Sequence, residues 1–223
     1  PEQARRTMLA IDHKSLLAKG AATVRLRHGQ KLVASLDEPY TLYFVVAGLI
    51  AIEIRPDEER RQILSFKRAG ECFWLSDYAM LPGLRSRAIV ATTLLKVPAP
   101  LQGAAGGTSL AAAIDAEDRG AARHARLQQA MLGRLTGEEK VVTFLLEEAV
   151  RAARPSAREA RFLLAMTRQD IADYLGLNAD TLSRVLTRLK QSGVIALTCR
   201  SDVLVRDIAR LRALSPLGEA IER

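Results

Sequence analysis

The sequence has few of the residues from which disulfide frameworks, metal centres and catalytic sites are built. Its only cysteines, Cys72 and Cys199, form no CxxC pair, so neither a disulfide framework nor a zinc finger is expected. Of its three histidines only His28 falls in the β-rich region, too few for the clustered ligands of a cupin-like metal enzyme. No nucleophile and base pattern, glycine-rich phosphate loop or carboxylate pair is present. We therefore expect no enzymatic activity, no bound metal and no cofactor.

Long apolar runs are also missing from the sequence. The longest, residues 42–52, is interrupted by Gly48 and falls short of the roughly 20 residues that span a bilayer. Residues 1–9 include Arg5 and Arg6, but the apolar segment of a secretory signal does not follow them. Together with the scarcity of cysteine, these absences favour a cytoplasmic protein without a membrane partner.

The sequence is rich in apolar residues and in positive charge. Hydrophobic residues make up 48% of the chain, which is enough for buried cores in a protein of 223 residues. The formal net charge is +8. An excess of positive charge favours an anionic partner such as nucleic acid.

Short runs of β-branched and aromatic residues, separated by turn residues, fill the first part of the chain. The runs lie at residues 24–27, 40–46, 49–54, 62–66 and 88–97. About seven short strands at this spacing are typical of a barrel or jelly roll.

Helical periodicity replaces the strand pattern after Pro98 and Pro100. The alanine-rich stretch at about residues 106–134 predicts one long helix, whose thin apolar stripe suits packing against another helix or against its own barrel. A second helix is expected after Thr136, because acidic residues follow in its first turn, and it should end before Pro155.

Residues 167–195 predict a helix-turn-helix. Thr167 and Asp170 have the spacing of a capping box, Gly176 allows a tight turn, and Asn178 can cap the next helix. That helix has an apolar stripe formed by Leu182, Val185, Leu186 and Leu189. Two short helices joined by a short turn containing glycine are typical of this motif. Residues 194–197 and 203–205 are expected to form the two strands of a wing.

The side of the second helix opposite its apolar stripe is polar. Its residues, spaced at helical intervals, are Asp180, Ser183, Arg184, Thr187 and Gln191. Such a face is common on any surface helix, but an arginine can bind guanine in the major groove and a carboxylate can accept from cytosine. We therefore predict that Asp180, Ser183 and Arg184 read bases. The residues expected to contact phosphates are Thr167, Arg168, Gln169, Asn178, Thr181 and Arg188.

Residues 136–212 resemble the C-terminal half of the Crp-Fnr family of bacterial regulators, and most closely its FixK and Fnr branch. The similar segments are GEEKVVTFLLE at 137–147, MTRQDIADYLGL at 166–177 and TLSRVLTRLKQSGVI at 181–195. The resemblance implies an α+β protein with a β-roll like that of cyclic-nucleotide-binding domains, a long dimerisation helix and a winged helix-turn-helix. The corresponding domains would be residues 1–103, 104–135 and 136–223.

The resemblance also implies a function. Members of this branch are homodimeric, sequence-specific transcription regulators that bind double-stranded DNA and contact RNA polymerase, more often as activators. Their recognition helix has a Glu-x-x-Ser-Arg pattern that reads half-sites similar to TTGAT. Here Ser183 and Arg184 match, whereas Asp180 departs from the pattern by being one methylene shorter than glutamate. FixK-like and Dnr-like relatives imply genes of low-oxygen or nitrogen-oxide respiration.

The effector is left open by the sequence. Where cyclic-nucleotide-binding relatives have a carboxylate and an Arg-Ser-Ala cassette, this chain has the segments 73–76 and 86–88, with Trp74 and no carboxylate, so cyclic AMP is not expected. The cysteine cluster of Fnr is absent. Haem on one of the histidines (His13, His28 or His124), oxidation of Cys199 in the wing, another small ligand, or no effector all stay open. A protein-interaction module with a drifted helix-turn-helix is the alternative function.

Overall fold

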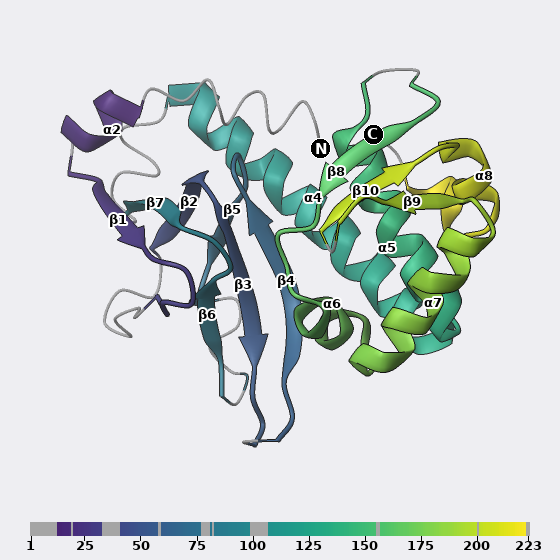
Figure 1. Ribbon diagram of the computed structural model, residues 1–223. Coiled ribbons are helices and arrows are strands. Elements are labelled where there is room, and N and C mark those ends of the chain that lie inside the picture. Colours follow the sequence, from purple (N-terminus) through teal and green to yellow (C-terminus); the bar gives the residue numbers. More distant parts are fainter. Residues whose placement is uncertain are drawn as a thin grey trace. The chain divides into compact units, whose positions relative to one another are not determined.

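The structure is a computed structural model of the chain (Figure 1). It describes residues 13–18, 20–32, 41–57, 59–76, 81, 83–98, 107–154, 157–199 and 201–221. The chain divides into two compact units, residues 1–122 and 123–223, and the division falls inside the long helix α4. The expected domain boundary between residues 103 and 104 lies outside the described residues.

Two antiparallel sheets form the first unit, as the short strand-like runs predict. Their strand orders are β1-β7-β2-β5 and β4-β3-β6. The strands are β1 (Ala22–Leu26), β2 (Leu42–Ala47), β3 (Leu49–Ile54), β4 (Gln62–Arg68), β5 (Cys72–Trp74), β6 (Arg85–Ala88) and β7 (Thr92–Val97). The first sheet is held by the pairing of β2 with both β5 and β7, and the second by the pairing of β3 with both β4 and β6.

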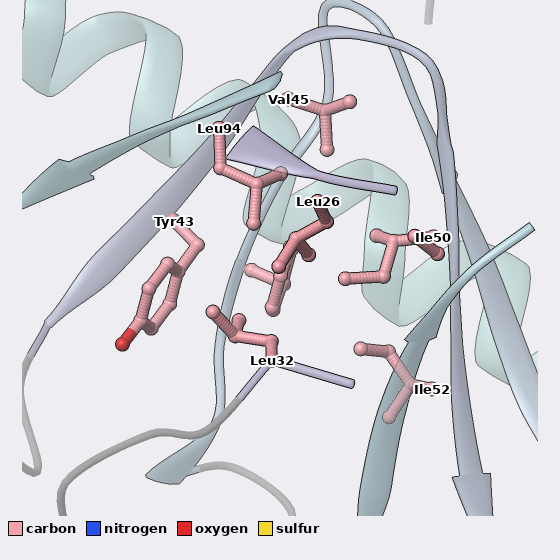
Figure 2. Close-up of a cluster of buried hydrophobic side chains, with 9 residues drawn as sticks. Leu26, Leu32, Tyr43, Val45, Ile50, Ile52 and Leu94 are labelled. Atoms are coloured by element: carbon pink, nitrogen blue, oxygen red, sulfur yellow. The ribbon is translucent and has the colours of Figure 1, made fainter. Parts of the chain in front are cut away.

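Strand β2 contributes side chains to two hydrophobic clusters, one on each face of its sheet. Tyr43 and Val45 point into an inner cluster with residues of both sheets, among them Ile50, Ile52 and Leu94 (Figure 2). The neighbouring residues of β2 point to the other face of their sheet, since side chains alternate along a strand. There they pack with Leu16 of helix α2 (His13–Ala18) and with the buried Cys72.

The predicted strand at residues 88–97 is wrong, because the structure contains two strands there. Strand β6 ends at Ala88 in the sheet of β3, and β7 begins at Thr92 in the sheet of β1 and β2. The residues between them cross from one sheet to the other, and the hydroxyl of Thr92 bonds both the N–H and the carbonyl of Leu49 at 3.1 Å. The run is therefore two strands, because its beginning pairs with one sheet and its end with the other. The expected strand at 40–46 begins at Leu42, and residue 40 lies outside the described residues.

Helix α4 (Gly107–Arg134) confirms the long helix predicted after the prolines. In the first unit its Ile114 packs against the cluster on the other face of the β2 sheet, which includes Leu16 and Cys72. Its Glu117 forms an ion pair with Lys67 of β4 at 3.3 Å, and burial raises the pKa of this carboxyl.

The second unit contains the predicted helix-turn-helix and wing. Its elements are α5 (Gly137–Ala152), β8 (Ala160–Leu163), α6 (Arg168–Leu175), α7 (Ala179–Gln191), β9 (Ile195–Leu197), β10 (Asp202–Val205), α8 (Ile208–Ala213) and the 3-10 helix η2 (Gly218–Ala220). The core side of α5 includes Phe144, Leu145 and Leu146. The wing sheet has the order β8-β10-β9, so a third strand joins the two that the sequence predicts. The α+β class is confirmed.

In the part of the chain that the structure describes, no helix combines the length and the hydrophobicity needed to cross a membrane.

Candidate nucleic-acid interface

Helix α6 begins at the capping box that the sequence predicts. The backbone N–H of Asp170 donates to the hydroxyl of Thr167 at 3.0 Å, and the carboxylate of Asp170 accepts from the Thr167 backbone N–H at 3.1 Å. The Thr167 hydroxyl also donates to that carboxylate at 2.8 Å. Asp170 is buried, so these bonds satisfy a charge that would be costly to bury alone.

The turn between α6 and α7 depends on Gly176. Its φ of 61° lies in the left-handed region, which glycine enters without a steric penalty. The N–H groups of Gly176 and Leu177 both donate to the carbonyl of Ala172. Asn178 then caps α7, because its side-chain oxygen accepts from the N–H of Thr181 at 2.7 Å. The path of the chain through the turn is therefore held by local bonds.

Helix α7 has one buried and one exposed side, as its periodicity predicts. The buried side chains are Leu182, Val185, Leu186 and Leu189. Those of Asp180, Ser183, Arg184, Thr187 and Gln191 are exposed. Within the described residues, neither Asp180 nor Arg184 forms an ion pair. The hydroxyl of Ser183 donates to the carbonyl of Ala179 at 2.8 Å, so a base would meet its remaining lone pairs.

The residues predicted to contact phosphates lie at the two helix starts and further along α7, and several already have protein partners. The hydroxyl of Thr167 is used in the capping box, and the amide of Gln169 donates to Asp173 at 2.6 Å. Asn178 uses its oxygen as a cap, which leaves its amide N–H groups for other acceptors. Thr181 is half-buried and Arg168 is half-buried. The predicted positions therefore differ in how readily they could meet a phosphate.

An ion pair that the sequence analysis did not find joins α7 to α5. The guanidinium Nη1 of Arg188 lies 2.9 Å from Oε2 of Glu138, and both side chains are exposed, at 62% and 45%. A charged pair of residues on separate helices is not signalled by either helix's own periodicity. Arg188 is thus held by a carboxylate of its own chain.

The wing contains Cys199, which is exposed in the loop between β9 and β10. Its sulfur lies 3.6 Å from the hydroxyl of Ser201. Hydrogen bonds from the backbone N–H and the hydroxyl of Ser201 lower the pKa of the thiol. A lower pKa raises the thiolate fraction at neutral pH and with it the reactivity towards oxidants. At the base of the wing, Arg161 of β8 binds Asp202 of β10 at 3.0 Å and lowers the pKa of that carboxyl.

Histidine 124 of α4 contacts two helices of the second unit. Its Nε2 forms a hydrogen bond of 2.9 Å with the hydroxyl of the buried Tyr174 on α6, and its Nδ1 lies 3.9 Å from Glu147 of α5. His28 bonds the carbonyl of Ile89 through Nδ1 at 2.6 Å. The side chain of His13 lies outside the described residues. No group of three or more potential metal ligands occurs among the residues that the structure describes.

The segment aligned with the phosphate cassette has a different arrangement here. Ala88 belongs to the inner cluster, so Arg87, the preceding residue of β6, projects from the opposite face of the sheet. Its guanidinium donates to Glu53 of β3 through Nε and Nη2, both at 3.3 Å. Glu53 is buried and also pairs with Arg55 at 3.4 Å and Arg61 at 3.7 Å. The cassette arginine therefore binds a carboxylate of its own chain.

Known regulators are similar to this chain in both sequence and fold. Residues 139–214 match the Crp-like helix-turn-helix domain. The nitrogen fixation regulation protein FixK of Azorhizobium caulinodans is 32% identical over 234 residues, covering 96% of this chain and 94% of that protein. The transcriptional activator protein FnrL of Cereibacter sphaeroides is 44% identical over 91 residues, covering 39% and 37%. The structure of FixK2 from Bradyrhizobium japonicum matches with a TM-score of 0.72 and 32% identity, covering 87% of this chain and 97% of that one.

Proposed function

This chain belongs to the Crp-Fnr family of transcription regulators, in its FixK-like branch, and we propose that it binds a palindromic, TTGAT-like DNA site as a homodimer. Its relatives are transcription regulators and not enzymes. The observation that supports the proposal best is the exposed polar face of α7, where neither Asp180 nor Arg184 has an ion-pair partner within the described chain. The Gly176 turn and the Asn178 cap hold this helix without using the residues of that face.

We propose a separate role for each of the three expected domains. Residues 1–103 form a sensor-like β-roll, residues 104–135 pair two subunits through α4, and residues 136–223 bind DNA. Two recognition helices then enter successive major grooves about one helical turn apart, and each reads half of a palindrome. Thr167, Arg168, Gln169, Asn178, Thr181 and Arg188 position the helix on phosphates.

Replacing Arg184 is the most direct test of sequence-specific binding. An arginine on the groove side of a recognition helix can donate two bonds to guanine O6 and N7. The Arg184→Ala variant should lose about 1–3 kcal/mol of discrimination at one guanine, while Arg188→Ala should weaken binding to all duplexes about equally. Equal losses on matched and mismatched duplexes for Arg184→Ala would contradict base reading by this side chain.

The first experiment is fluorescence anisotropy with a labelled TTGAT-N4-ATCAA duplex and a scrambled duplex at the same salt concentration. Selective binding by a dimer without added ligand is the expected result. Weak, unselective binding would favour a ligand-gated or haem-gated regulator, a site altered by Asp180, or a protein-interaction module with a drifted helix-turn-helix. Adding candidate ligands to the same assay separates the gated regulator from the other two.

We propose that the regulator activates transcription by contact with RNA polymerase, at genes of low-oxygen or nitrogen-oxide respiration. The FnrL relative is a transcriptional activator by name, and the FixK relative is a nitrogen fixation regulator. Transcription in vitro with purified RNA polymerase, from a promoter that contains the site, should increase when the protein is added. A decrease would identify a repressor.

Cys199 is the residue that we propose as a redox effector site. Its exposure and its lowered pKa favour oxidation, and an oxidised, negatively charged sulfur in the wing would repel nearby phosphates. Peroxide should weaken DNA binding by the native protein but not by a Cys199→Ser variant. Equal loss in that variant would exclude Cys199 as the oxidised site. The other cysteine, Cys72, is the less reactive thiol, because it is buried and burial raises its pKa.

A further inference from the structure

The N-terminus of α5 lies against the helix-turn-helix. A Cβ added at Gly137 would be 3.4 Å from a methyl group of Leu177 in the turn and 3.5 Å from the methyl of Thr181 on α7. Glu138, the next residue, therefore lies beside the start of α7 and reaches Arg188 further along that helix. A carboxylate is thus placed among residues to which we assign phosphate contacts.

The pair of Glu138 and Arg188 is accessible to a competing anion. Both side chains are exposed, and exposed ion pairs contribute little to stability. Phosphate and carboxylate both accept from the same guanidinium fork. When DNA approaches, the guanidinium either leaves Glu138 or draws a phosphate close to that carboxylate. Both routes cost binding free energy, the first through the lost pair and the second through repulsion between like charges.

We propose that Glu138 sets the DNA affinity of this regulator by competing with phosphate for Arg188. The inference rests on the proposed function, in which Arg188 contacts the DNA backbone. A phosphate contact contributes to every duplex, whatever its sequence. Glu138 therefore lowers the affinity for specific and non-specific DNA by the same factor and leaves their ratio unchanged. It limits how much of the protein is held on non-specific DNA.

The test compares Glu138→Gln with Glu159→Gln, which removes the same charge from an exposed position outside this pair. Glutamine keeps the length of the side chain but cannot form the ion pair. Glu138→Gln should tighten binding to the matched and the scrambled duplex two- to fivefold in low salt, with their ratio unchanged. The plot of log K against log [salt] should become steeper by up to about 0.9 for each arginine released to a phosphate.

A double mutant shows whether the effect passes through Arg188. In an Arg188→Ala background, Glu138→Gln should change the affinity no more than Glu159→Gln does. The inference is overturned if Glu138→Gln leaves both affinities unchanged or lowers them, or if it tightens binding equally without Arg188. Thermal melting of each variant checks that α5 is intact, because acidic residues in the first turn stabilise a helix.

Failure of the proposed function gives a different result. If the protein is not a sequence-specific binder, the native chain fails to distinguish the matched from the scrambled duplex, whatever residue stands at position 138. The comparison of variants on either duplex still measures the effect of Glu138 on Arg188.

Discussion

Replacing Glu53 by glutamine should destabilise the β-roll more than any other single change of an acidic residue in the first unit. Only 1% of the Glu53 side chain is exposed, and its carboxylate binds Arg55, Arg61 and Arg87 at 3.3–3.7 Å. The variant removes the single negative charge from the centre of three positive ones. Glutamine fills the same volume, so the change tests charge rather than packing.

The expected cost follows from the burial of the cluster. Removing one member of a buried ion pair costs about 3–5 kcal/mol, because the remaining charge stays buried without compensation. The three arginine side chains remain 16–30% exposed, so water compensates them in part. The amide oxygen of glutamine can still accept one hydrogen bond. We therefore expect a loss of about 2–3 kcal/mol in the free energy of unfolding of the β-roll.

The assay is urea denaturation followed by the fluorescence of Trp74. This residue is the chain's single tryptophan and lies on β5, so it reports the β-roll and not the DNA-binding unit. With a slope of about 1–3 kcal/mol per molar urea, the midpoint should fall by roughly 0.7–3 M. Glu59→Gln, at an exposed position in the connection between β3 and β4, is the matched control. A midpoint for Glu53→Gln equal to that of the control would refute the reasoning.

Three further changes test the DNA-binding unit. Thr167→Ala should cost about 0.5–2 kcal/mol in thermal unfolding because it removes the capping box, and Thr167→Ser should cost clearly less. Tyr174→Phe removes the hydroxyl that binds His124 and should cost about 0.5–1.5 kcal/mol; an unchanged melting temperature would mean that the bond adds no net stability. The hydrogen bond from Arg161 lowers the pKa of Asp202 below its ordinary value of 3.8. Their pair therefore stabilises the wing at every pH above 3.8, and this stabilisation is lost as the pH falls through the lowered pKa of the folded state. Asp202→Asn should therefore remove that acid-dependent loss of stability from a pH series of melts.

The elements of the site that depend on local sequence were predictable. The capping box at Thr167, the turn at Gly176 and the cap at Asn178 involve bonds between residues at most four positions apart, apart from the Leu177 N–H bond to Ala172. The buried and exposed sides of α7 follow from the helical period alone. The base-reading residues could be proposed from the exposed side of α7 together with the helix-turn-helix pattern and the resemblance at Ser183 and Arg184, all of which are local in sequence.

The tertiary structure decided the features that join distant parts of the chain. The run at residues 88–97 is rich in apolar and β-branched residues throughout, and only the pairing of its two ends with different sheets makes it two strands. Likewise, the pairs that bind Arg188 to Glu138, Tyr174 to His124 and Arg87 to Glu53 link residues on separate elements. By itself the sequence determined helices α4 to α7, the turn at Gly176 and the exposed side of α7, because local periodicity and capping set these, whereas the short helices α2 and α8 were not predicted. Which charged side chain meets which partner depends on how the elements pack, and no local pattern records that.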